Sequence, residues 1–208
     1  IVGYCDMTVA DARPQLDRLK AYPLVRGVRM QLHWHETPAF RFASSADQVI
    51  DPTVRANVKR LKDYGFSFDL QLFAPQMKDG LQLVSENPDT SFVLTHCGML
   101  TSDNKAAVEE WKHGLRTLAL APNLFAKMSG LGTFGHRNDP DLIALVYDAA
   151  VDILGSDRLM FGSNFPIEKL WTSYAALIDA HRSAAARYTQ AQQADIFWRT
   201  ADRVYKPA

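Results

Sequence analysis

The sequence has few cysteines, no excess of either charge and no long hydrophobic run. Only Cys5 and Cys97 are present among 208 residues, without a CxxC or a Cys/His zinc spacing, so we expect two reduced thiols and no disulfide framework. Basic and acidic residues both number 23, which leaves no positive field for nucleic acid. No apolar run approaches the ~20 residues of a membrane span. These absences favour a cytoplasmic protein that acts on a small molecule and binds neither nucleic acid nor membrane.

Two further features are missing. No GxGxxG and no P-loop sequence follows any predicted strand, which argues against a nucleotide-binding sheet. The chain also begins with Ile1 rather than methionine, and residues 1–6 already have the sequence of a strand. We therefore expect that the sequence begins within a fold, at one of its strands.

Six short apolar segments are present, and helical segments separate them. The predicted strands are residues 1–6, 25–32, 67–73, 91–96, 124–129 and 158–161. The predicted helices are residues 9–22, 51–64, 78–87, a segment through Trp111 to 121, 139–154, 168–187 and 189–205. Strands joined by helices of this length must pair in parallel, because tight hairpins cannot connect parallel neighbours. We predict a single α/β domain, residues 1–208, of the (β/α)8 TIM-barrel type, with six units present and the first two missing upstream of Ile1. Its open edge would favour self-association, so a homo-oligomer is one expectation.

Polar residues stand at the carboxyl ends of these strands, where the chemistry of parallel barrels gathers. Period-two alternation places them in sets that share one face of each strand. The sets are Arg29 with Gln31, Asp69 with Gln71, Phe92 and Leu94 with His96, Phe125 with Lys127 and Ser129, and Met160 with Gly162 and Asn164. A core built only for packing would not place polar groups in this layer repeatedly, so the pattern predicts one shared site.

Each residue also has a purely structural interpretation. His96 alone could be a hydrogen-bonded core histidine, Lys127 and Arg29 could only neutralise Asp69, and Asn164 could cap its own turn. The helical histidines, His113 and His181, are expected to be solvated. The long segment 33–50 contains Trp34 and His35 and is a candidate lid over the site.

Three motifs resemble those of a known family. Residues 95–98 (THCG) resemble its D-H-x-G, residues 127–130 (KMSG) its K-x-S-G, and residues 158–166 (RLMFGSNFP) its R-x-M-F-G-S-D-W-P. The family is the amidohydrolase 2 group of metal-dependent hydrolases, which includes sugar lactonases and pyrone dicarboxylate lactonase. The resemblance covers essentially the whole chain and implies a (β/α)8 barrel that opens a ring by hydrolysis.

The sequence departs from the family pattern in two places. The family carries an H-x-H pair on its first strand, whereas the pair His33 and His35 follows a middle strand here and is not equated with it. The family's aspartate after the last strand is Asn164, and an amide neither takes up a proton near neutral pH nor matches a carboxylate as a metal ligand. We therefore expect no metal bound by this chain and no cofactor. The alternative is a divalent metal such as zinc, if an H-x-H segment lies upstream.

The resemblance and the strand-end residues together predict a hydrolase that opens a small sugar-derived or dicarboxylate lactone. His96 and Asn164 are the expected catalytic residues, the first polarising the carbonyl or moving a proton and the second orienting water. If a carboxylate base is needed, Glu168 is nearest in sequence. The expected substrate-binding residues are Arg29, Gln31, Trp34, His35, Lys127 and Ser129. The alternatives are an inactive or ligand-binding barrel fragment and, less favoured, a metal-dependent decarboxylase.

Overall fold

One parallel sheet organises the fold. The computed structural model describes residues 1–206, and its six strands lie in sequence order. They are β1 (Val2–Tyr4), β2 (Gly27–Arg29), β3 (Ser67–Leu70), β4 (Phe92–Leu94), β5 (Leu124–Met128) and β6 (Leu159–Phe161). Every neighbouring pair is parallel, as predicted, and within residues 1–206 β6 does not pair with β1. The sheet is therefore open. The predicted units upstream of Ile1 remain a prediction, and residues 207–208 of the predicted domain lie outside the described part.

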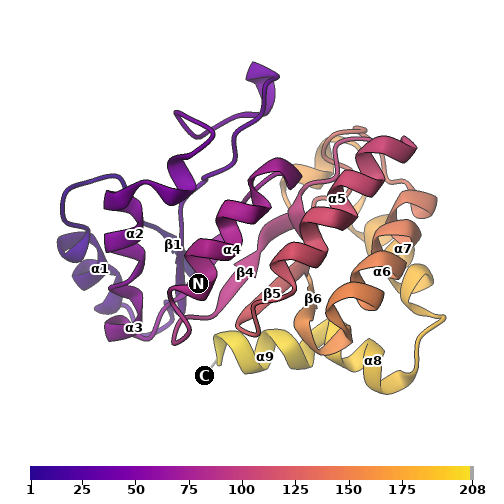
Figure 1. Ribbon diagram of the computed structural model, residues 1–208. Helices are drawn as coiled ribbons and strands as arrows, with labels where there is room; N and C mark the ends of the chain where they lie inside the picture. Colours follow the sequence, from indigo (N-terminus) through magenta and orange to yellow (C-terminus); the bar gives the residue numbers. More distant parts are fainter. Residues whose placement is uncertain (207–208) are drawn as a thin grey trace.

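Helices follow the strands and cover one face of the sheet (Figure 1). They are α1 (Arg13–Lys20), α2 (Pro52–Val58), α3 (Leu61–Tyr64), α4 (Met77–Ser85), α5 (Lys105–Leu118), α6 (Pro140–Leu154), α7 (Tyr174–Ala185), α8 (Gln190–Ala194) and α9 (Thr200–Tyr205). The same local signal starts α2 and α6. The side chains of Asp51 and Asp139 each accept two backbone N–H bonds, and a proline occupies the first turn.

Four predicted helices differ from the structure. The helix predicted over residues 51–64 is divided into α2 and α3 by a turn at residues 59–60. The helix predicted over residues 9–22 begins only at Arg13, because the hydroxyl of Thr8 bonds to Asp6 instead of capping a helix. The helix predicted over 168–187 begins at Tyr174, where the hydroxyl of Ser173 accepts the N–H of Ala176, and residues 167–170 form a separate 3-10 turn. The last predicted helix is interrupted by a π-helical turn at residues 195–199.

The two faces of the sheet have different neighbours. On the helix-covered face, Leu70 and Leu72 pack so closely on α4 that a methyl group at Gly80 would come within 2.5 Å of Leu72. The pairing register places Asp69 beside Arg29 and Val93, and Val93 beside Phe125. Since paired residues of parallel strands share a face, the other face carries the charged side chains of β2, β3 and β5.

Helix α9 lies at the amino ends of the strands. Thr200 donates to the carbonyl of Asp157 just before β6, and Arg26 just before β2 donates to the carbonyl of Lys206. Figure 1 shows α9 along the lower edge of the molecule, whereas the segment 33–50 rises at the opposite end. The carboxyl ends of the strands are thus left to the loops.

Candidate functional site

His96 reaches the charged face through an unusual backbone turn. It lies two residues beyond Leu94, and period-two alternation would keep both on one face, together with Phe92. The register contradicts the predicted common face, since Val93 rather than Phe92 or Leu94 pairs with Asp69 and Phe125. His96 and Cys97 have left-handed backbone angles, with φ of 54° and 47°, and this turn redirects the imidazole. Its Nδ1 lies 2.9 Å from Oγ of Ser129 at the end of β5.

Two glycines bring the neighbouring strand ends against this pair. A methyl group at Gly130 would lie 2.5 Å from Nδ1 of His96, and one at Gly162 would lie 3.1 Å from Cβ of Ser129. Side chains at these positions would push the backbones apart. The ends of β4, β5 and β6 therefore meet closely because residues 130 and 162 lack side chains.

The electrostatic environment keeps the His96 imidazole neutral. Burial, followed by the positive charges of Arg29 and Lys127, lowers its pKa to about 4 from an ordinary value near 6.5. The ring is only partly shielded from solvent, so a ligand can reach it. The structure thus brings together four predicted site residues: Arg29, His96, Lys127 and Ser129.

Asp69 holds Lys127 in place. The carboxylate is 1% exposed, and it accepts a 2.5 Å bond from Nζ of Lys127 and a 2.8 Å bond from the hydroxyl of Tyr205. The Lys127 ammonium also lies 5.1 Å from the centre of the Tyr205 ring. Burial and the nearby Asp69 carboxylate raise the pKa of Tyr205, so the phenol stays protonated. Tyr205 did not emerge from the sequence, because it lies 136 residues from Asp69 and in a different unit.

Asn164 contacts a different partner from His96. Its Nδ2 donates to Oε1 of Glu168 over 3.3 Å, and its backbone carbonyl accepts the Glu168 N–H over the same distance. Asn164 lies two residues past Gly162 and therefore close to the strand-end group, but the described residues show no hydrogen bond between it and His96. Its expected catalytic role stays a prediction.

Trp34 and His35 lie beside another cavity. Both line a space of about 410 Å³ with Gln76, and its other walls include the acidic residues Glu36, Asp47, Asp79 and Glu110. His35 packs against Phe40 and Phe73, and the Trp34 backbone N–H is fixed by the Gln76 side chain. The expected substrate contacts of Trp34 and His35 stay a prediction. Gln31 is partly exposed after β2, and its role also stays a prediction.

Two other histidines lie in the interior. His33 is 5% exposed, packs between Phe42 and Phe73, and has an unpartnered Nδ1, and burial lowers its pKa to about 4. The prediction that His181 is solvated is wrong. It is 1% exposed, and its Nδ1 lies 2.9 Å from the hydroxyl of Tyr147, because its face of α7 packs on α6.

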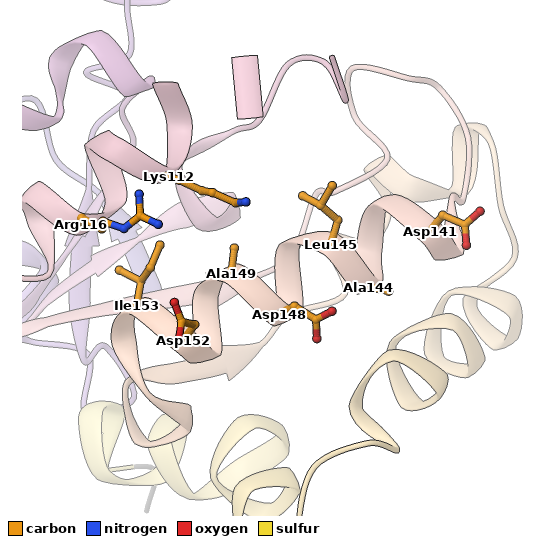
Figure 2. Close-up of a pocket in the computed structure, with 9 residues that line it drawn as sticks. All are labelled: Lys112, Arg116, Asp141, Ala144, Leu145, Asp148, Ala149, Asp152 and Ile153. Carbon is orange, nitrogen blue, oxygen red and sulfur yellow. The ribbon is translucent and has the colours of Figure 1, made fainter. Parts of the chain in front are cut away.

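A further cavity lies outside the sheet, between α5 and α6. It has a volume of about 630 Å³, and Figure 2 shows Lys112 and Arg116 of α5 on one side of it, across from the α6 side chains. The α6 side chains are Asp141, Ala144, Leu145, Asp148, Ala149, Asp152 and Ile153. None of the strand-end residues lines it, so this cavity is separate from the strand-end group.

The comparison with known families agrees with the fold and the strand-end motifs. The sequence model of the family described as amidohydrolase matches residues 1–206. The chain belongs to the amidohydrolase family. This amidohydrolase is thus an enzyme of the amidohydrolase superfamily.

Relatives of this amidohydrolase cover nearly its whole length. It is 33% identical over 206 residues to the uncharacterized protein y4mH of Sinorhizobium fredii, spanning 99% of this chain and 69% of that protein. It is 28% identical to an L-fucono-1,5-lactonase of Burkholderia multivorans, spanning 99% of this chain and 70% of the lactonase.

A crystal structure of a Burkholderia multivorans amidohydrolase with bound zinc superimposes with a TM-score of 0.85 at 27% identity, covering all of this chain and 73% of that one. A probable 2-pyrone-4,6-dicarboxylic acid hydrolase from Acinetobacter baumannii, at 15% identity and a TM-score of 0.76, covers 99% of this chain and 72% of that chain and supports the fold alone. The fold is of the TIM-barrel type, as predicted.

The prediction that no cofactor is involved is contradicted by the zinc in the similar amidohydrolase. The side chains present here nevertheless do not fit a zinc site. Among residues 1–206 no three His, Cys, Asp or Glu side chains lie close enough together to hold a metal ion. The mistaken prediction relied on the Asn164 amide, which is a weak metal ligand. A weak ligand at one position does not exclude metal ligands contributed by other residues. No step of the chemistry below is assigned to a metal.

The length and apolar character of the described helices show whether any of them could cross a membrane. No helix within residues 1–206 combines the length and the apolar character that crossing a bilayer requires. This agrees with the lack of long apolar runs in the sequence.

Proposed function

We propose that this amidohydrolase hydrolyses a small lactone, of the sugar-acid or dicarboxylate kind, at the carboxyl ends of β2, β4 and β5. The observation that carries the proposal is the neutral His96 beside two cationic side chains, Arg29 and Lys127. The similarity to an L-fucono-1,5-lactonase supports it. The proposed partner is therefore a small molecule, and the proposed location is the cytoplasm.

The low pKa of His96 favours a role as an electrophile. A neutral imidazole with a pKa of about 4 is a weak base but a good hydrogen-bond donor. When the Ser129 hydroxyl donates to Nδ1, the proton of the ring lies on Nε2 and can be donated to the lactone carbonyl. His96 would then stabilise the negative charge that develops on that oxygen.

The cations supply the remaining stabilisation. Water adds to the carbonyl carbon, the bond from that carbon to the ring oxygen breaks, and a proton from the water ends on the ring oxygen as a hydroxyl. The product is a hydroxy acid. Arg29, which is exposed, and Lys127, which pairs with Asp69, would bind the substrate's hydroxyls or carboxylate, and their positive charges would favour the anionic intermediate. Asn164 would orient the attacking water.

Acid release from a panel of lactones tests the proposal. L-Fucono-1,5-lactone, D-glucono-1,5-lactone and 2-pyrone-4,6-dicarboxylate are hydrolysed with and without added zinc, and proton release is compared with the spontaneous rate. We expect acceleration of at least one lactone and a loss of about 10²-fold or more in His96→Ala. Calorimetric binding of a lactone without turnover under both conditions would favour the ligand-binding barrel instead.

A further inference from the structure

Glu168 is a buried carboxylate without a cationic partner. It is 0% exposed, and no lysine, arginine or histidine within residues 1–206 forms a salt bridge with it. Three neutral side chains donate to it instead: Trp171 Nε1 over 2.6 Å, Asn164 Nδ2 over 3.3 Å and Thr133 Oγ1 over 3.4 Å. A buried carboxylate is expensive unless it is hydrogen-bonded, so these donors are what allow it to remain there.

The carboxylate joins two loops at the mouth of the site. Thr133 belongs to the loop after β5, whereas Asn164 and Trp171 belong to the loop after β6. The packing is tight, since a methyl group at Gly132 would lie 2.9 Å from Oε2 of Glu168 and 2.6 Å from Nε1 of Trp171. Glu168 therefore has little freedom to turn away from Asn164.

This contact determines which way the Asn164 amide faces. A carboxylate only accepts hydrogen bonds, so the amide must present its nitrogen to Glu168. The amide oxygen, Oδ1, then points elsewhere, and among residues 1–206 no donor bonds to it. Oδ1 is free to accept a hydrogen from a molecule in the site.

We propose that Glu168 is a positioning residue that holds the Asn164 amide with its oxygen directed to the attacking water or a substrate hydroxyl. The proposal rests on the proposed lactone hydrolysis for the identity of that molecule. It also gives a physical reason for asparagine at this position. An aspartate would place a second carboxylate about 3.3 Å from Glu168, and two charges so close in a buried place repel strongly.

Exchange of the two polar groups tests the proposal. The variants are Asn164→Asp, Glu168→Gln and the double variant, in which the glutamine amide donates to the new aspartate and so restores a bond of reversed polarity. Thr133→Val is the control, because it removes the longest of the three bonds without changing a charge. Thermal unfolding and L-fucono-1,5-lactone turnover are measured for each full-length chain, with the best lactone of the panel used in its place if that one is preferred.

Because Asn164 and Glu168 are in contact, the changes in Tm of the two single variants should not add up to that of the double variant. Asn164→Asp should lower Tm by about 5 °C, and the double variant should regain most of that loss. In Glu168→Gln, the amide oxygen can replace Oε2 and keep the Trp171 bond, while the amide nitrogen replaces Oε1 and donates to Thr133 or Asn164. Tm should therefore change little, while the Asn164 amide turns over and its Oδ1 no longer faces the site. If the Tm change of the double variant equalled the sum of the two single changes, the proposed contact would be overturned. This measurement requires no substrate.

Turnover separates positioning from a structural role. Glu168→Gln should lower kcat by about 10–100-fold with KM within about twofold, as expected when a group that orients a reacting residue is lost. The control should retain kcat within about threefold. Non-additive changes in Tm together with an unchanged kcat in Glu168→Gln would overturn the positioning role. Absence of turnover in the wild type alone would instead count against the lactone proposal, and the unfolding cycle would still decide whether the pair exists.

Discussion

His96 and Gly130 lie so close together that no side chain fits between them. A methyl group at position 130 would come within 2.5 Å of Nδ1 and 3.0 Å of Cε1 of the imidazole. Gly130→Ala should therefore displace His96 from Ser129 and lower lactone turnover by more than about tenfold, since misplaced catalytic groups lose rate steeply. Steady-state kinetics on the best lactone measures this.

Gly65→Ala is the matched control for that variant. Both glycines have left-handed backbone angles, with φ of 63° at Gly130 and 65° at Gly65, but nothing lies within 4 Å of a methyl group at Gly65. Both substitutions should cost about 1–2 kcal/mol in free energy of unfolding from backbone strain. Equal turnover in the two variants would show that the approach of Gly130 to His96 is unimportant.

Lys127→Met should leave a buried charge at Asp69. The carboxylate is 1% exposed, and the Lys127 side chain is 22% exposed, so we expect a loss of about 3 kcal/mol, the low end for a broken buried pair. Urea unfolding measures the loss. The double variant with Asp69→Asn removes the stranded charge and should recover most of it. If the double variant is no more stable than Lys127→Met, the pair does not stabilise the fold in this way.

Tyr205→Phe removes the other donor to Asp69. A hydrogen bond to a carboxylate contributes about 1.5–3 kcal/mol, so the free energy of unfolding should fall by about that amount. Tyr174→Phe is a suitable control, because Tyr174 is 54% exposed and its loss should change stability by less than about 0.5 kcal/mol. Indistinguishable urea midpoints for the two variants would contradict the role of Tyr205.

His181 should make stability depend on pH. Burial lowers its pKa in the folded protein to about 4, while the unfolded chain keeps an ordinary value near 6.5. Below pH 6.5 the unfolded state binds a proton that the folded state does not, so this contribution to stability is full above pH 6.5 and declines as pH falls toward 4. Between pH 7 and pH 5 it amounts to roughly 2 kcal/mol as an upper value.

Unfolding of His181→Gln at those two pH values measures this contribution. The variant should lose roughly 2 kcal/mol less than the wild type on acidification, and His113→Gln, which alters an exposed histidine, should not. The His181→Gln variant should still lose stability on acidification because of His33 and His96, whose pKa values are lowered similarly. An unchanged pH dependence in His181→Gln would contradict the assignment.

The sequence predicted the parallel pairing of the strands and the starts of α2 and α6, because these depend on local signals. Asp51 and Asp139 act through residues two and three positions away, so the cap is visible in a few letters. The parallel pairing follows from the length of the connections. Both kinds of information are contained in short windows of sequence.

The site was less predictable because it depends on contacts between distant residues. Alternation cannot foresee the left-handed turn at His96, which brings that residue to the face that Phe92 and Leu94 do not share. A helical pattern around residue 181 is the same whether a helix faces solvent or α6. Trp34 and His35 were assigned to the site by their place after β2, and that assignment stays a prediction, because the direction of a long loop is set by packing, here through Gln76.

The position of α9 has a consequence for the order in which the protein is completed during synthesis. The chain emerges from the ribosome amino end first, and β3 and β5 can pair with their neighbours while residues beyond 130 are still being made. Asp69 and Lys127 can meet at that stage, but the second donor to Asp69 is Tyr205 of α9, which lies 136 residues further along the chain. A nascent chain that does not yet include α9 therefore lacks one of the two donors to the buried Asp69 carboxylate, and α9 supplies it.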